Sequence, residues 1–171
     1  MENKNKEKIG FTIGKFAPLH KGHQYLIETA LKEMDKVIVV VYDTDVIDIE
    51  AEKRANWIKE LYPNVEIRFA HNPPSKYGLD EESVNIQMKY LSEIIKDEVP
   101  THFYSSEKYG ASVAKYMNIV DRRVDNERAT VPIRATEIRN DIEKNKKWIE
   151  DNVYLDCKDT HKLTKHSIDN L

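Results

Sequence analysis

The stretch Gly14-Lys15-Phe16-Ala17-Pro18-Leu19-His20-Lys21-Gly22-His23 joins two segments of different pattern. The apolar run 9–13 before it is typical of a strand, and the amphipathic segment 24–34 after it is typical of a helix. The first N–H groups of a helix lack intrahelical partners, and the helix dipole favours negative charge there. Two imidazoles and two ammonium groups within the same stretch add further donors. The stretch therefore predicts a polyphosphate site.

The two histidines of this stretch also allow less specific interpretations. His20 and His23 are three residues apart, so they share one helix face if the helix begins near Lys21. A lone histidine in such a place more often caps a turn or is an ordinary helix residue than binds a ligand. No nearby Cys, Asp or Glu has ligand spacing, and a closed zinc site needs about four ligands. We therefore expect no metal held by the protein here.

Length, composition and charge exclude several classes of protein. The chain has 171 residues, of which 33% are charged and 40% hydrophobic, as expected of one globular domain. A net charge of −3 argues against a nucleic-acid partner. The single cysteine, Cys157, allows no intrachain disulfide and favours a reducing compartment. Residues 1–8 lack the apolar core of a signal peptide, and no apolar run reaches the roughly 20 residues of a membrane span. We expect a cytoplasmic protein without a membrane partner.

Strand and helix patterns alternate along the chain. We expect strands at 9–13, 36–42, 65–70, 101–104 and 119–124, and helices at 24–34, 50–61, 81–96, 105–117 and 136–145. Ser105, Ser106 and Glu107 look like the N-cap of the fourth helix. This alternation predicts an α/β fold with a doubly wound, parallel five-stranded sheet of the Rossmann-like type. Residues 1–150 form the predicted domain, and residues 151–171 follow as a helical or loose tail.

The loops that follow the strands should gather on one side of this sheet. Ligands of such folds bind at the carboxyl ends of the strands. The segments that this rule brings together are 15–23, 43–48, 71–78, 105–107 and 125–139. The predicted polyphosphate stretch is among them.

Two strings resemble signatures of the nucleotidylyltransferase superfamily. The ten-residue stretch matches GxFxPxHxGH at every fixed position, namely Gly14, Phe16, Pro18, His20, Gly22 and His23. Ile133-Arg134-Ala135-Thr136-Glu137-Ile138-Arg139 resembles the ISSTxIR motif of the same superfamily, with Arg134 and Ala135 as departures. On residues alone, Thr136 at a helix start is a routine cap and Arg139 a routine surface residue. The two signatures in the correct order are a stronger indication than either one.

The resemblance extends to the NadR-type nicotinamide-nucleotide adenylyltransferases over residues 9–148. It rests on 14–16, 54–58, 102–107 and 131–133. It implies transfer of AMP from ATP to nicotinamide mononucleotide, which gives NAD and pyrophosphate. The superfamily often assembles, so a homo-oligomer stays open. The chain contains no Walker A string, and we expect no P-loop kinase activity.

The resemblance also implies roles for individual residues. It assigns His20, His23, Lys15 and Arg139 to the ATP phosphates, with Thr136 as a hydrogen-bond partner. Mg²⁺ would be bound by the substrate triphosphate rather than by a protein cage. Further nucleotide contacts are expected from Gly14, Phe16, Ala17, Ser105, Ser106, Ile138, Trp57 and Asp43. Trp57 is equally well placed for the core, and a loop carboxylate such as Asp43 is often merely solvated.

The acceptor and the activity itself have alternatives. Relatives that bind nicotinamide nucleotide commonly stack an aromatic residue from the loop after the third strand on the pyridine ring, and here that loop offers His71 and Tyr77 rather than Trp. The acceptor could therefore be nicotinate mononucleotide, pantetheine phosphate or FMN, and the transfer could be of a cytidylyl group. Arg134 in place of Ser also leaves open a nucleotide-sensing module without turnover.

Overall fold

The computed structural model describes residues 6–76 and 78–160. Its centre is one sheet of five parallel strands in the order β3-β2-β1-β4-β5. The strands are β1 (Ile9–Gly14), β2 (Lys36–Tyr42), β3 (Glu66–Ala70), β4 (His102–Ser105) and β5 (Val120–Arg123). The sheet and its parallel pairing confirm the predicted doubly wound α/β fold. Chain order reverses beside β1, which places the topological switch point at the carboxyl end of this strand.

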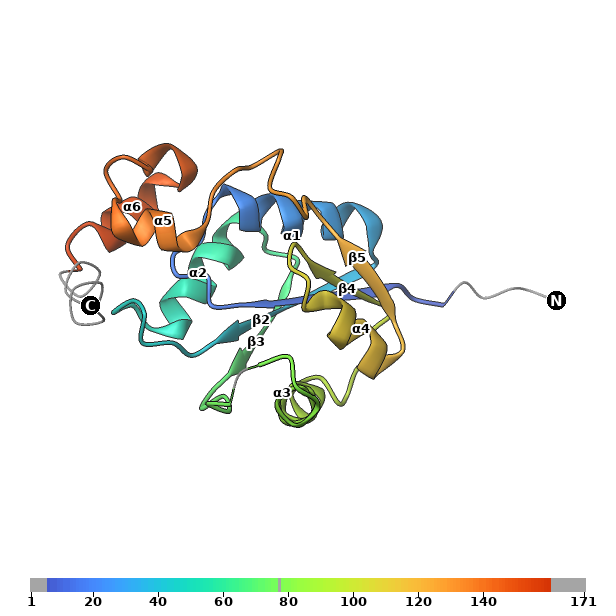
Figure 1. Ribbon diagram of the computed structural model, residues 1–171. Helices are drawn as coiled ribbons and strands as arrows, with labels where there is room; N and C mark the ends of the chain where they lie inside the picture. The colour runs from blue at the N-terminus through green and yellow to red at the C-terminus, as the bar shows by residue number, and fades with distance from the viewer. Residues whose placement is uncertain (1–5, 77, 161–171) are drawn as a thin grey trace.

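Helices cover both faces of the sheet (Figure 1). On one face lie α1 (Lys21–Glu33) and α2 (Ala51–Leu61), and on the other lie α3 (Glu81–Ile94) and α4 (Gly110–Met117). The chain then continues through α5 (Ala135–Asn140), a short 3₁₀ helix (Lys146–Trp148) and α6 (Asp151–Cys157). These last helices gather beside α2 in Figure 1. None of the helices in the described ranges has the length and apolar character needed to span a bilayer.

Strand β2 shows why the sheet forms where it does. Residues 37–41 are all at most 2% exposed. Val37, Val39 and Val41 belong to the core on the α1/α2 face, whereas Ile38 and Val40 belong to the core on the α3/α4 face. Side chains alternate between the faces of a strand, so an unbroken β-branched run suits a strand that is covered on both sides.

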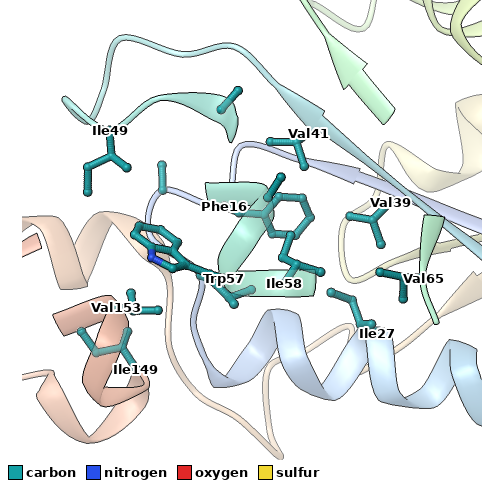
Figure 2. Close-up of a cluster of buried hydrophobic side chains, with 14 of the residues drawn as sticks. Phe16, Ile27, Val39, Val41, Ile49, Trp57, Ile58, Val65, Ile149 and Val153 are labelled. Carbon is teal, nitrogen blue, oxygen red and sulfur yellow. The ribbon is translucent and has the colours of Figure 1, made fainter. Parts of the chain in front are cut away.

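The C-terminal helix belongs to the larger of the two cores. Val153 of α6 packs in the same cluster as Trp57 of α2 and Ile149 (Figure 2). The Trp57 Nε1–H donates to Asp156 Oδ2 at 2.8 Å, which fastens α6 to α2. Cys157 is buried as well, and burial raises the pKa of its thiol to about 12. Of the predicted tail, 151–157 is helical and packed, and 161–171 lies outside the described residues.

The predicted start of the fourth helix was wrong. Ser105 is the last residue of β4, and α4 begins at Gly110 after Tyr109, which makes no side-chain cap. The Ser105 hydroxyl donates instead to the carbonyl of Glu107, at 3.3 Å, and so stabilises a turn before the helix. A Cβ on Gly110 would collide with the Ser105 hydroxyl, so this turn requires glycine.

The predicted end of the fifth helix was also wrong. We expected the helix to run to residue 145, but α5 ends at Asn140. The Asn145 side-chain amide donates to the carbonyls of Glu137 and Asp141, at 3.0 and 2.9 Å. These bonds satisfy carbonyls at the helix end and favour a turn over a further helical turn.

Candidate active site

A polar cavity of about 280 Å³ lies at the carboxyl ends of β1 and β4. Its walls come from the loop between β1 and α1, from α1, from the loop after β4 and from the start of α5. Seven of the predicted site residues line it: Gly14, Phe16, His20, His23, Ser105, Ser106 and Thr136. The two sequence signatures, more than a hundred residues apart, therefore share one cavity.

His20 is the N-cap of α1. Its Nδ1 accepts the N–H groups of Gly22 and His23, at 3.0 and 3.4 Å. In return, His23 Nδ1 accepts the N–H group of His20, at 3.1 Å. The sequence suggested that the first N–H groups of this helix lack partners. In the structure, the two imidazoles accept hydrogen bonds from the first backbone N–H groups of the helix start. A ring nitrogen that accepts a hydrogen bond carries no proton, so each neutral imidazole presents an Nε2–H donor.

Both imidazoles are neutral at physiological pH. Burial, and secondarily the positive charge of Arg128, lowers the pKa of His20 to about 3. The pKa of His23 is also held well below its usual value by burial, by His20 and by Arg128. The rings stack with centroids 3.7 Å apart and an interplanar angle of 22°. The pair therefore offers hydrogen-bond donors rather than positive charge.

Gly22 permits this arrangement. A Cβ at residue 22 would lie 2.8 Å from Cε1 and 3.0 Å from Nδ1 of the His20 ring. The Phe16 ring contacts the His23 ring in an edge arrangement, with 4.9 Å between centroids. Phe16 has a φ of 49°, which turns its backbone sharply while its ring enters the core shown in Figure 2. The signature thus places a glycine where the His20 ring needs room and an aromatic ring in contact with His23.

Positive charge in the polar cavity comes from Arg128 and Arg134. Arg128 donates to the carbonyl of Ile133 at 3.1 Å and forms an ion pair with Glu107. Arg134 Nη1 lies 4.0 Å from Glu107 Oε1. Sequence reasoning missed Arg128, which stands in a loop without periodic pattern. The available signal was Asp125, whose carboxylate accepts the N–H groups of Thr130 and Val131 at 2.9 Å and folds this loop.

Lys15 and Arg139, the two cations that the resemblance assigned to the ATP phosphates, are not among the residues that line the polar cavity. Arg139 donates through Nη1 to the carbonyl of Ala17, at 2.7 Å, and its Nη2 is 3.4 Å from the Thr136 hydroxyl. It therefore ties α5 to the loop that carries the first signature. Lys15 is exposed and lines a neighbouring apolar cavity.

Four of the predicted contact residues do not line the polar cavity. Ala17, Trp57 and Ile138 are 1%, 2% and 0% exposed and belong to the core. Asp43 lines a separate surface pocket near the start of α2, where its Oδ1 is 3.0 Å from His71 Nδ1. Tyr77, the other aromatic considered for ring stacking, lies outside the described residues. The core position of Trp57 is the alternative that its sequence pattern left open.

An apolar cavity of about 390 Å³ adjoins the polar one on the α3/α4 side of the sheet. The two share Ile13, Gly14 and Tyr109 as lining residues. The other residues that line it are Lys15, Tyr42, Gly78, Leu79, Val84, Gln87, Met88, Ser112 and Val113. Burial raises the pKa of Tyr109 to about 12, so its hydroxyl stays neutral. Together the cavities form a continuous site with one polar and one apolar half.

Arg54 holds together backbone segments that lie next to this site. Its side chain is 1% exposed and donates to three backbone carbonyls. These carbonyls belong to Lys15 in the loop after β1, to Tyr42 at the end of β2 (3.0 Å) and to Ile49 in the loop after β2 (2.9 Å). A buried guanidinium with several donors in fixed geometry is suited to holding such loops together.

Within the described part of the chain, no group of three or more His, Cys, Asp or Glu side chains is arranged to hold a metal ion. A metal that participates here would be bound mainly by the oxygens of a substrate, as is usual for Mg²⁺ with phosphates.

Comparison with known proteins agrees with this geometry. Residues 10–77 match the family model described as the citrate lyase ligase C-terminal domain. The NadR protein of Escherichia coli K12, a trifunctional NAD biosynthesis and regulator protein, is 27% identical over 155 residues, which cover 80% of this chain and 37% of NadR. A phosphopantetheine adenylyltransferase of Fusobacterium nucleatum is 42% identical over 57 residues, 32% of this chain and 35% of that protein.

Solved structures of related proteins are also similar to this chain. A NadR crystal structure with NAD and AMP-PNP has a TM-score of 0.61 and 25% identity, over 84% of this chain and 44% of the NadR chain. A bifunctional NMN adenylyltransferase/ADP ribose pyrophosphatase of Francisella tularensis, with AMP and a manganese ion, has a TM-score of 0.65. At 18% identity over 96% of this chain and 53% of that one, it shares the fold. This chain thus spans less than half of the length of NadR. The chain is therefore similar in sequence and in fold to NadR proteins, and over part of its length it is similar in sequence to a phosphopantetheine adenylyltransferase.

Proposed function

We propose that this protein transfers AMP from ATP to nicotinamide mononucleotide, giving NAD and pyrophosphate. The observation that carries the proposal is the pair of contiguous cavities that meet at Ile13, Gly14 and Tyr109. A nucleoside triphosphate needs a polar pocket with donors, and a pyridine nucleotide needs an apolar pocket for its ring. The similarity to NadR, an NAD biosynthesis and regulator protein with a structure in complex with NAD and AMP-PNP, supports the proposal.

The polar cavity suits the triphosphate of ATP. The Nε2–H groups of His20 and His23 supply neutral donors, and Arg128 and Arg134 supply positive charge. Arginine is well suited to phosphate because its planar donors bind two oxygens at once. Mg²⁺ bound by the triphosphate would neutralise further charge. The Thr136 hydroxyl at the start of α5 adds a donor to the same wall.

The apolar cavity suits the pyridine ring of the acceptor. Tyr42, Met88 and Tyr109 contribute aromatic and thioether surface. Among the described residues that line it, Lys15 is the only cation. A carboxylate on the ring, as in nicotinate mononucleotide, would lose hydration with little compensation, whereas a carboxamide is neutral. This composition favours the amide over the acid.

The reaction requires no protein nucleophile. A phosphate oxygen of nicotinamide mononucleotide attacks the α-phosphorus of ATP, a new P–O bond forms, and the bond to the bridging oxygen breaks as pyrophosphate leaves. Alignment of the two substrates and stabilisation of charge on the leaving group account for most of such catalysis. In this proposal, the imidazole donors and the two guanidinium groups of the polar cavity stabilise the charge on the leaving group.

The assay measures NAD and pyrophosphate after purified protein is mixed with ATP, Mg²⁺ and nicotinamide mononucleotide. We expect at least a tenfold preference in kcat/KM over nicotinate mononucleotide. The local match to a phosphopantetheine adenylyltransferase makes pantetheine phosphate the second acceptor to test. If only pantetheine phosphate is turned over, the acceptor in this proposal is wrong and pantetheine phosphate replaces it. If the protein binds ATP but releases no pyrophosphate with any of the acceptors, the proposed catalysis is contradicted.

A further inference from the structure

Glu107 occupies an unusual position for a carboxylate. It lies in the wall of the polar cavity, where a triphosphate would place several negative charges. Its carboxylate forms an ion pair with Arg128 and lies 4.0 Å from Arg134. A carboxylate in an anion pocket repels the anion, so its presence calls for a physical reason.

Arg128 explains why the carboxylate is there. Its side chain is only 19% exposed, and it lies close enough to both imidazoles to lower the pKa of each. An unpaired guanidinium at such a site would be costly, because burial removes its hydration. The ion pair with Glu107 compensates this charge while the cavity contains no anion.

From this geometry we infer that Arg128 contacts the triphosphate of the nucleotide and that Glu107 is its internal counter-anion, displaced when the triphosphate binds. The inference rests on the proposed function only in taking ATP as the nucleotide. Arg128 then exchanges one anionic partner for another. Its positive charge never stands uncompensated in the partly buried wall.

The side chains around the pair are compatible with this exchange. The Glu107 side chain is 43% exposed, so it can turn toward solvent without unfolding the site. Arg128 is held separately by its bond to the Ile133 carbonyl, and therefore keeps its position when Glu107 leaves. Arg134 is 59% exposed at the rim and can follow either anion. The same exchange in reverse would assist release of pyrophosphate.

Binding of inorganic tripolyphosphate and of adenosine, each measured by calorimetry on the full chain, tests the inference. Arg128→Gln should weaken tripolyphosphate binding by about tenfold or more, the usual effect of losing one charge-assisted hydrogen bond. Adenosine binding should remain within about twofold, since a collapsed loop would weaken both ligands. Arg128→Lys should recover part of the loss. Glu107→Gln should tighten tripolyphosphate binding by about three- to tenfold.

Arg122→Gln serves as the matched control. Arg122 forms a two-bond ion pair with Glu33, at 3.1 Å for each bond, and is not among the residues that line the polar cavity. Its loss should leave tripolyphosphate binding unchanged. Wild-type affinity in Arg128→Gln, or weaker binding in Glu107→Gln, would overturn the inference. If the binding pattern holds but no dinucleotide forms, the inference stands and the proposed acceptor is wrong.

Discussion

The imidazole of His20 stacks on that of His23, and each ring accepts a backbone N–H group of the other residue. The stack is stable only while both rings are uncharged, because two imidazolium ions 3.7 Å apart would repel each other strongly. The conformation of the first turn of α1 is thus coupled to the protonation state of the two histidines. Acid should disturb both together.

We expect the stability of the fold to fall as the pH drops below about 6.5. In the unfolded chain each imidazole binds a proton near its usual pKa of about 6.5, whereas His20 in the folded chain does so only at about 3. The unfolded state therefore binds more protons between these values and is favoured by acid. Well inside this range His20 should remove about 1.4 kcal/mol per pH unit from the free energy of unfolding, and His23, whose pKa is also lowered, should add a loss in the same direction. Urea denaturation at pH 7 and pH 5 measures the effect.

The variant His20→Asn separates this effect from that of carboxylates. It keeps a side-chain acceptor for the helix N-terminus, and it should show a smaller loss of stability between pH 7 and pH 5. Nitrogen NMR of the wild-type rings should show protonated Nε2 and unprotonated Nδ1 at pH 7. A His20 ring that titrates near pH 6.5 would disprove the neutral pair.

Gly22→Ala should impair catalysis more than stability. The added methyl group must displace the His20 ring, which it would meet at 2.8 Å. Displacement of a catalytic group by a fraction of an ångström to 1 Å can cost about 100-fold in rate. The free energy of unfolding should change by less than about 1 kcal/mol, since alanine favours a helix while the contact opposes it. Lys32→Ala, on an exposed position of the same helix, should keep wild-type kcat/KM.

Trp57→Phe should destabilise the protein without weakening ATP binding. The change removes the hydrogen bond to Asp156 and leaves a void between α2 and α6, with an expected cost of about 1–3 kcal/mol. Thermal unfolding and ATP titration measure the two effects. Asp156→Asn, which keeps an acceptor oxygen, should cost less. A loss of ATP affinity in a Trp57→Phe protein of normal stability would instead place the indole at the nucleotide.

Arg54→Met should be among the most destabilising substitutions in the chain. It leaves the carbonyls of Lys15, Tyr42 and Ile49 without this donor, and a buried unsatisfied group costs about 1–3 kcal/mol. We expect a loss of about 3 kcal/mol or more in denaturant unfolding. Arg122→Met, which removes a partly exposed ion pair, should cost about 1 kcal/mol or less. Similar losses for the two variants would contradict the support role of Arg54.

The sheet could be predicted from sequence because its signals are local. The bounds of β2 were predicted to the residue, since an unbroken β-branched run has few other solutions. Helix ends were harder. The start of α4 depends on the hydrogen bond of Ser105 to the Glu107 carbonyl and on the space that Gly110 leaves for the Ser105 hydroxyl, and the end of α5 depends on the Asn145 side chain. Both helix ends are determined by contacts that the hydrophobic periodicity of the sequence does not reveal.

The candidate site divides in the same way. The histidines belong to a continuous string with a recognisable pattern, and the structure places both in one cavity. Arg128 reaches that cavity through a loop whose shape depends on Asp125 and on backbone amides downstream. Trp57 has a helical spacing that suits core and ligand equally well. Only its packing against α6 distinguishes the two.

The three carbonyls around Arg54 have a consequence for binding kinetics. The loops after β1 and β2 are fixed to one guanidinium when the chain folds. Their conformational entropy is therefore lost at folding, and substrate does not have to order them on arrival. Because these loops are already ordered, we expect the association rate constant of the nucleotide to approach the diffusional range. Its affinity is then governed by the dissociation rate constant.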